Sequence, residues 1–298
     1  MDTYDVYHNG SFLPPQEVNI PAQDASFQHA IGLFETFSAY QGKVFRLDDH
    51  LARLKASAAQ LGIHPDLDTA PLAEAVHQTI THNNISRARI RLTFTPGSLS
   101  LLRPEADQNP EPTVIITPTA PVQYDPAYFN KGIRVIIGAP LGNPFDPLAG
   151  HKNLAYWSRL TMLRTAAAAG AGEAIILNIT NHLASGSVSN LFLVKDGALF
   201  TPFAHGEELP DALPAPVLPG ITRKTVLEIA AEENIPVNIK MLTVEDLLEA
   251  DEVFLTNASW LVLPVTSVEQ KDIGDAAVGS ITSQIRDQLM KLIETETS

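Results

Sequence analysis

Lys152 combines a residue type and a sequence position that point to specific chemistry. It stands in the segment GHKNLAYW, between a turn-rich loop and an expected helix, and the chain holds only 20 lysines and arginines in all. A lysine whose pKa is lowered by its surroundings is a nucleophile that forms a Schiff base with an aldehyde. Because a solvated lysine at a helix start would give the same local pattern, other residues have to decide between the two interpretations.

Three further places in the sequence are suited to holding an anion. The segment 219–223 (Pro-Gly-Ile-Thr-Arg) begins an expected helix, where free N–H groups and the helix dipole favour negative charge. Arg53 lies on the polar face of another expected helix, and a guanidinium there can grip a phosphate with two N–H groups. Asn257 and Ala258 end an apolar strand, where loop N–H groups can complete such a site. An ordinary helix cap, a surface ion pair and a simple strand end are the structural alternatives.

The elements that must position these residues indicate a mixed α/β fold. Residues 88–95 alternate strictly, with Ala88, Ile90, Leu92 and Phe94 on one face, which is typical of a half-buried strand. The other elements expected in the first half are hairpins over 4–13 and 34–45, a helix capped by Asp48 or Asp49 and ended by Gly62, a helix over 71–82 and a strand over 113–117. Those expected in the second half are strands over 133–137, 174–177, 237–241 and 253–256, a hairpin over 191–200, and helices over about 153–169, from 221 onward and at the C-terminus.

The length of 298 residues suits two domains. Pro118, Pro121 and Pro126 punctuate a stretch without periodicity, and we expect the domain boundary there. The predicted division is a small N-terminal α/β domain (1–120), a linker (121–132) and a large C-terminal domain (133–298).

Composition argues against several classes of function. The net charge is −14 and no basic cluster is interleaved with aromatic residues, so we expect no nucleic-acid partner. The chain has no cysteine, which excludes disulfides, thiolate metal sites and a cysteine nucleophile, and the spacing of its 9 histidines predicts no metal site. No apolar run reaches the roughly 18 residues of a membrane span, and the polar N-terminus lacks a signal-peptide pattern. We therefore expect a cytoplasmic protein without a membrane partner.

Five segments, in this order, resemble the class IV aminotransferase family, whose members are pyridoxal 5′-phosphate (PLP) enzymes of fold type IV. They are residues 29–54, 151–157, 189–202, 219–223 and 251–265. The family includes branched-chain aminotransferases, D-amino-acid aminotransferases and 4-amino-4-deoxychorismate lyase. The resemblance implies a smaller N-terminal α/β domain and a larger C-terminal PLP-binding domain, with the cofactor between them, and it implies a homodimer.

The resemblance also implies roles for individual residues. Lys152 matches the Schiff-base lysine that also shuttles protons, and Arg53 matches the arginine that holds the cofactor phosphate. Further cofactor-binding candidates are Gly220, Ile221 and Thr222 at the phosphate, Asn257 and Ala258 closing the phosphate site, and Tyr156 near the phenolate oxygen. Candidates for binding the substrate are Phe34, Arg91 and Arg103.

Two departures from the family pattern bear on the chemistry. Ser185 stands where most members have a glutamate that pairs with the pyridine nitrogen. A serine cannot keep that nitrogen protonated as a carboxylate would, so a weaker electron sink is expected. Residues 95–97 (Thr-Pro-Gly) replace a common Thr-Arg-Gly, so an arginine that recognises the substrate carboxylate is missing there, and Arg91 or Arg103 are the candidates to replace it.

Three functions follow from this pattern. The leading hypothesis is an aminotransferase that moves an amino group between a small amino acid or amine and a keto-acid acceptor. The second is a lyase that eliminates pyruvate from aminodeoxychorismate. The run GLFETFSAYQGKVFRLDDH and the pair Thr256-Asn257 look at least as lyase-like, and elimination asks less of the ring nitrogen. The third is a catalytically silent PLP-binding protein, which Ser185 alone supports.

Overall fold

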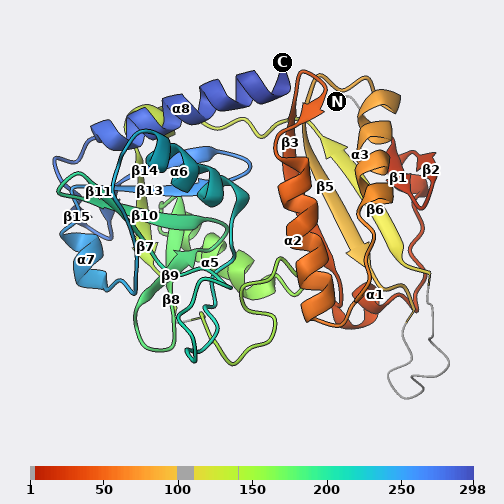
Figure 1. The fold of residues 1–298 in the computed structure, drawn as a ribbon, viewed down its shortest axis with the longest axis horizontal. Helices are drawn as coiled ribbons and strands as arrows, with labels where there is room; N and C mark the ends of the chain where they lie inside the picture. The colour runs from red at the N-terminus through yellow and green to blue at the C-terminus, as the bar shows by residue number, and fades with distance from the viewer. Residues whose placement is uncertain (1–3, 99–110, 140) are drawn as a thin grey trace. The chain divides into compact units, whose positions relative to one another are not determined.

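The computed structural model describes residues 4–98, 111–139 and 141–298. The chain forms two compact units (Figure 1). The first unit comprises Met1–Val122, His151–Ala155 and Ile293–Ser298, and the second comprises Gln123–Gly150 and Tyr156–Leu292. The mixed α/β class predicted from the sequence is confirmed, and the predicted domain boundaries stay a prediction.

The first unit is built on a six-stranded sheet in the order β2-β1-β6-β5-β3-β4. Its strands are β1 (Val6–His8), β2 (Ser11–Leu13), β3 (Leu33–Tyr40), β4 (Lys43–Val44), β5 (Arg87–Thr95) and β6 (Thr113–Thr119). Helices α2 (Leu47–Gln60) and α3 (Ala70–His82) lie on this sheet (Figure 1). A short 3-10 helix (Pro15–Glu17) and helix α1 (Ala25–His29) precede β3.

The two faces of this sheet differ in character. The predicted alternation over 88–95 is confirmed, because Ala88, Ile90, Leu92 and Phe94 are all buried in the core that α2 and α3 share with β3 and β5. The register pairs Phe34 with Thr93 and Thr36 with Arg91, so these four side chains belong to the opposite face. That face therefore carries the predicted substrate-binding residues of β3 and β5.

Helix α2 begins differently from the sequence prediction. Its N-cap residue is Arg46 in the left-handed conformation, with φ of 55°, and no side chain caps the helix. Asp48 and Asp49 lie inside the first turn instead. They act there through the helix dipole, which favours negative charge near the N-terminus, so the predicted aspartate cap is wrong.

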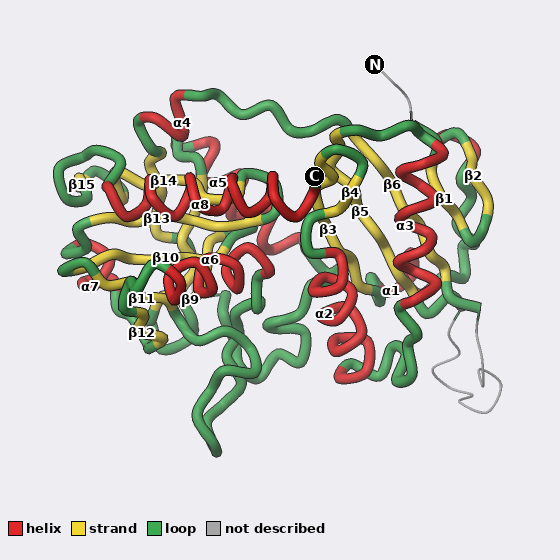
Figure 2. The backbone as a smooth tube through the Cα atoms, turned by 45° about the horizontal axis from the view of Figure 1, so that its top comes forward, coloured by secondary structure: helices red, strands yellow, loops and turns green. Residues whose placement is uncertain are grey.

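The second unit contains a nine-stranded sheet whose main path runs β12-β11-β10-β13-β14-β7-β8-β9, with β15 paired to β14. Its strands are β7 (Ile133–Ile137), β8 (Glu173–Leu177), β9 (Leu183–Gly186), β10 (Asn190–Lys195), β11 (Ala198–Thr201), β12 (Val237–Ile239), β13 (Glu252–Asn257), β14 (Leu261–Val268) and β15 (Lys271–Asp272). Its helices are α4 (Ala127–Asn130), α5 (Trp157–Ala168), α6 (Ile221–Glu232), α7 (Val244–Leu248) and α8 (Ser280–Thr297), whose last residues group with the first unit. Helix α6 packs on β13 (Figure 2). Three residues join β9, at one end of the path, to β10, the third strand from the other end. Such a short connection keeps the two strands close together, so the sheet has to curl.

The helix predicted over about 153–169 starts later than expected. Helix α5 begins at Trp157, because the residues before it pair with β3 rather than coil. The N–H of Phe34 donates to the carbonyl oxygen of Lys152 at 2.9 Å, and the N–H of Leu154 donates to that of Gly32 at 3.0 Å. Among the larger elements, β9 and β14 were not predicted from the sequence.

A buried ion cluster fixes α2 to β3. Glu35, which is 1% exposed, accepts hydrogen bonds from Arg53 Nε at 2.9 Å and Arg53 Nη2 at 2.6 Å. The Nδ1 atom of His50 lies 2.7 Å from the same carboxylate. Burial by itself raises the pKa of Glu35, but the charge of Arg53 and the hydrogen bond from His50 outweigh burial and hold this pKa at about 2. Burial lowers the pKa of His50, so the cluster carries one carboxylate and one guanidinium.

We expect Glu35→Gln to lower the free energy of unfolding by about 3–5 kcal/mol at neutral pH, because it leaves the Arg53 guanidinium buried without its carboxylate. Urea denaturation measures this loss. Glu228→Gln is the matched control, since Glu228 forms an exposed helix pair with Lys224, and it should cost less than about 1 kcal/mol. Equal effects of the two substitutions would contradict the role given to Glu35.

The native chain and Glu35→Gln should also differ in their pH dependence. The pKa of Glu35 is about 2 in the folded chain against an ordinary 4.5, so its stabilisation is fully present above about pH 5. It is lost as the pH falls through the interval between the two pKa values. We therefore expect the difference between the two proteins to shrink by up to about 1.4 kcal/mol per pH unit below about pH 4.5. A difference that grew on acidification would contradict this.

Candidate active site

Lys152 is held against the start of β3 by the two backbone hydrogen bonds that delay helix α5. Gly32 makes this close approach possible. A Cβ added there would lie 2.7 Å from Leu154 Cδ1 and 2.9 Å from the carbonyl oxygen of Phe94, closer than real Cβ contacts come. His151, just before the lysine, is fixed as well, because its Nδ1 lies 2.9 Å from Ser57 Oγ on α2. The lysine therefore stands on a segment that hydrogen bonds hold to β3 and α2.

Two cations meet on one aromatic ring at this position. The Nζ atom of Lys152 lies 4.4 Å from the centre of the Phe34 ring, and the Cζ atom of Arg91 lies 3.8 Å from the same centre. Arg91 is held along β5 by a hydrogen bond from its Nε to Thr93 Oγ1 at 3.2 Å. The structure thus brings together Lys152, Phe34 and Arg91, while Arg103 lies outside the described residues.

Arg53 and Lys152 both act electrostatically on His50, a member of the ion cluster. After burial and the Glu35 carboxylate, the positive charges of Arg53 and Lys152 are further influences on the pKa of His50. The side chain of Arg53 is only 9% exposed, so the alternative of a solvated surface ion pair is wrong. Its role at a phosphate stays a prediction.

In the second unit, the segment 185–190, which joins β9 to β10, connects the other predicted residues. Asn190 Nδ2 donates to the carbonyl oxygen of Leu218, just before the start of α6, at 2.8 Å. Asn257 Nδ2 donates to the carbonyl oxygen of Val188 at 3.2 Å. The segment is therefore bonded both to the α6 start and to the end of β13, and it carries Ser185 itself.

The start of α6 has the features of an anion site. Gly220 is its N-cap residue, and no side chain caps the helix. A Cβ added at Gly220 would lie 2.0 Å from Asn190 Oδ1, so any other residue there would displace the Asn190 side chain. Thr222, in the first turn, is 6% exposed. A helix start without a side-chain cap turns its N–H groups and the positive end of its dipole toward an anion.

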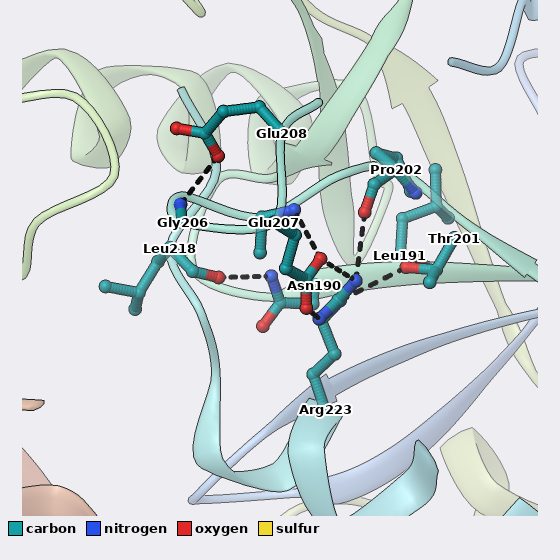
Figure 3. Close-up of polar contacts among 10 residues, drawn as sticks. Asn190, Leu191, Thr201, Pro202, Gly206, Glu207, Glu208, Leu218 and Arg223 are labelled. Carbon is teal, nitrogen blue, oxygen red and sulfur yellow. Dashed lines mark hydrogen bonds and ion pairs between the residues drawn. The ribbon is translucent and has the colours of Figure 1, made fainter. Parts of the chain in front are cut away.

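Arg223 ties the loop of residues 203–218 to the first turn of α6 (Figure 3). It is 2% exposed and forms a double ion pair with Glu207, from Nη1 at 2.6 Å and from Nη2 at 2.7 Å. Its Nη2 also donates to the carbonyl oxygen of Pro202 at 3.1 Å. Arg223 is thus committed to holding the loop in place.

Asn257 and Tyr156 have positions that refine their predicted roles. The Oδ1 atom of Asn257 accepts from the N–H groups of Ser259 at 2.8 Å and Trp260 at 3.0 Å. With its amide nitrogen bonded to Val188, the side chain of Asn257 shapes the loop that also contains Ala258. Tyr156 is the partly buried N-cap residue of α5. The contacts of these residues with a cofactor stay predictions.

Sequence reasoning missed three residues that organise the site: Glu35, Asn190 and Arg159, whose Nη1 lies 3.4 Å from Ser185 Oγ. It also gave no role to the side chain of Arg223. Glu35 had a detectable signal, because in LFETFSAY it shares the face of Leu33 and Phe37, and a carboxylate on a buried face requires a partner. The others depend on contacts between elements distant in sequence, which no local pattern reveals.

Two other kinds of site are absent from the described ranges. No group of three or more histidines or acids there is arranged to hold a metal ion. None of the helices that the structure describes has the length and apolar character needed to cross a membrane.

Comparison with known proteins gives a family match. The family model described as Amino-transferase class IV matches residues 32–268. A putative branched-chain-amino-acid aminotransferase of Methanocaldococcus jannaschii is 32% identical over 285 residues, covering 95% of this chain and 94% of that protein. A D-alanine aminotransferase of Staphylococcus haemolyticus is 27% identical over 309 residues, covering 98% of this chain and 99% of that protein.

Solved structures are similar over nearly the whole chain. A T.th. branched-chain amino acid aminotransferase with pyridoxamine 5′-phosphate has a TM-score of 0.86 at 25% identity, covering 99% of this chain and 95% of that one. The 4-amino-4-deoxychorismate lyase from Pseudomonas aeruginosa has a TM-score of 0.81 at 26% identity, covering 96% of this chain and 98% of that one. The two-domain architecture of fold type IV is thereby confirmed.

The family match extends over well more than half of the chain, and the relatives are similar over almost their full lengths. Enzymes of this family depend on PLP, so the cofactor predicted from the sequence is confirmed. The resemblance found in the five ordered segments is confirmed as well: the chain belongs to the class IV aminotransferases.

Proposed function

We propose that this enzyme transfers the amino group of a small α-amino acid to a keto acid, with PLP attached to Lys152 as a Schiff base. The donor loses its amino group and leaves as a keto acid, and the acceptor gains that group. The relatives named for branched-chain amino acids and for D-alanine support a small donor with one carboxylate at Cα.

The observation that carries the proposal is the shared ring of Phe34. The Lys152 amine and the Arg91 guanidinium both lie on it, at 4.4 Å and 3.8 Å from its centre. An α-amino acid carries its amino group and its carboxylate on one carbon atom, so a reactive amine and a carboxylate-binding cation have to be neighbours. A guanidinium holds a carboxylate through two parallel N–H groups, which also fixes the orientation of Cα.

The residues of the second unit fit the phosphate end of PLP. The start of α6 has no side-chain cap, and Asn190 fits closely against Gly220. Thr222 adds a hydroxyl beside the N–H groups of that turn, and Arg53 is a further candidate cation. A chain of net charge −14 needs such local positive groups to retain a doubly charged phosphate. The departure from the family at Ser185 concerns the opposite end of the cofactor.

When bound, PLP supplies an aldehyde for the lysine and a ring that withdraws electrons from Cα. The residues of the protein position the substrate and the reacting groups. Arg91 would orient the substrate carboxylate, and the Lys152 amine would take up the proton that the substrate Cα loses. The pairing of 152–154 with β3 keeps this amine on a fixed backbone, as proton transfer over hydrogen-bonding distance requires.

Borohydride reduction tests the attachment. We expect a phosphopyridoxyl mass on the peptide that contains Lys152, and none in Lys152→Ala after soaking in excess PLP. Lys240→Ala is the matched control, because the Nζ atom of Lys240 also lies over an aromatic ring, 4.9 Å from the centre of Phe200, and this variant should keep the adduct on residue 152. An adduct on any other lysine of the native protein would overturn the assignment.

Steady-state kinetics tests Arg91. We expect Arg91→Gln to raise KM for amino-acid donors by about 10- to 100-fold, since a charge-assisted hydrogen bond contributes about 1.5–3 kcal/mol. Transfer from (R)-1-phenylethylamine, which has no carboxylate, should change little. Arg87→Gln is the control, because Arg87 also lies on β5 over an aromatic ring, that of Tyr40. An unchanged KM for amino acids would remove Arg91 from substrate binding.

A lyase is the second candidate, and Ser185 is the observation that favours it. Elimination of pyruvate from aminodeoxychorismate makes a smaller demand on the ring nitrogen than amino transfer does. A coupled assay for pyruvate separates the two functions. Fast release of pyruvate, with no conversion of PLP by simple amino acids, would replace the aminotransferase proposal by the lyase.

We also propose that the enzyme is a homodimer. Large apolar side chains are exposed on the second unit, including Trp157 at 71% and Phe145 at 68%, and an interface between two copies would bury side chains of this kind. Light scattering should give twice the mass of 32.3 kDa, and a single-chain mass at micromolar concentration would refute the dimer. The cytoplasmic location stays a prediction that fractionation of cells can check.

A further inference from the structure

Ser185 lies on the side of its sheet that α5 covers. It is 3% exposed and stands opposite Ile176 in the register of β8 and β9. Directly opposed residues of antiparallel strands point to the same side, so Ser185 shares the side of Ile176 and of Ala174, two positions earlier. Ala174 packs against Ala166 and Met162 of α5. Helix α5 is therefore the element that supplies the neighbours of Ser185.

The charged neighbour that α5 supplies is an arginine. Arg159 Nη1 lies 3.4 Å from Ser185 Oγ and donates to the carbonyl oxygen of Ser187 at 3.2 Å. The hydroxyl of Ser185 itself donates to the carbonyl oxygen of Gly186 at 2.8 Å, so its lone pairs are turned to the guanidinium. Within the described ranges Arg159 forms no ion pair with a carboxylate. Its positive charge at Ser185 is not neutralised there.

The nearest carboxylate in the sheet points the other way. Glu173 is fully buried on β8, on the side opposite to Ala174 and Ile176. It accepts hydrogen bonds from the N–H groups of Ala174 at 2.9 Å and Val188 at 3.2 Å, and from Ser189 Oγ at 3.2 Å. Burial raises the pKa of Glu173. The Glu173 side chain holds the turn between β9 and β10 in place. It does not replace the missing family glutamate.

The remaining charged groups nearby are also cations or are already paired. Arg223, in the first turn of α6, is neutralised by Glu207. Arg164, further along α5, is exposed. The residues of β9 and of the turn after it carry no charge. Arg159 thus sets the sign of the potential at Ser185.

We propose that Arg159, which contacts Ser185, faces the pyridine nitrogen of the bound cofactor and keeps that nitrogen unprotonated. The inference rests on the proposed function, in which PLP is attached to Lys152 and Ser185 takes the family position at the ring nitrogen. A guanidinium only donates hydrogen bonds, so it can bind a pyridine nitrogen but not a pyridinium N–H. A fixed positive charge within a few ångströms also disfavours adding a second one. The class of ligand group recognised here is a neutral aromatic nitrogen acceptor.

Nitrogen NMR of the protein loaded with PLP labelled with 15N in the ring tests this directly. In the native enzyme we expect the resonance of an unprotonated pyridine throughout the neutral range. In Arg159→Gln the ring nitrogen should gain a proton at a pH at least about one unit higher than in the native protein. Arg164→Gln, the same change on the same helix, should behave as the native protein does.

A second variant replaces the positive charge expected at the ring nitrogen by a negative one. Arg159→Gln combined with Ser185→Glu places a carboxylate at the nitrogen without the guanidinium, and we expect the pyridinium resonance at neutral pH. The native spectrum alone is decisive if a variant does not fold: a protonated ring nitrogen there overturns the inference. So does Arg159→Gln titrating like Arg164→Gln. Borohydride mass mapping accompanies each sample. An adduct on Lys152 with a protonated nitrogen refutes only this inference, whereas no adduct on Lys152 refutes the proposed function.

Discussion

The pairing of residues 152–154 with the beginning of β3 is the constraint on which the reactive end of the site depends. Two backbone hydrogen bonds, at 2.9 Å and 3.0 Å, attach a segment from the middle of the sequence to the sheet of the first unit. They exist because Gly32 has no side chain to obstruct Leu154. As a result Lys152 shares the ring of Phe34 with Arg91, although the three residues are far apart along the chain. A lysine on a freely solvated loop would lose most of this orientation to rotamer entropy.

Positive charge is concentrated at particular places in a chain that is acidic as a whole. Glu35 is buried with Arg53, and the partly exposed Glu207 pairs with the buried Arg223, so both guanidiniums are oriented by carboxylates rather than left to solvent. Such pairs add little net stability, because desolvation offsets most of the attraction, but they fix geometry firmly. The start of α6 has no side-chain cap, and Arg159 forms no ion pair with a carboxylate among the described residues. An anion or a neutral acceptor is what these two places favour.

The sequence predicts which residues form the site better than it predicts the contacts that position them. Lys152, the helix start at Ile221 and the alternating strand over 88–95 follow from local patterns, since periodicity and turn chemistry are local properties. The start of α5 does not, because β3 competes for the same backbone groups and tertiary pairing overrides helix propensity. Arg159 carries no signal in its own neighbourhood. Its contact with Ser185 joins residues 26 positions apart through a helix, a strand and a turn.

The pair of Ser185 and Arg159 affects how much the other residues of the site must contribute to removing the Cα proton. A neutral ring withdraws electrons less strongly from Cα than a protonated one, so the proton on Cα is less acid when the substrate is bound. The other contributions to its removal then matter more: a lysine fixed by backbone pairing with β3 and, in the proposed function, a substrate carboxylate bound by Arg91. Enzymes compensate for a weaker electrophile by closer positioning of base and substrate, since well-oriented groups offset several kcal/mol of a barrier. The rigid attachment of Lys152 to β3 is the feature of this chain that meets such a demand, and it is equally useful for amino transfer and for elimination. The choice between these reactions therefore rests on what leaves the substrate after the proton has been removed, and not on the base that removes it.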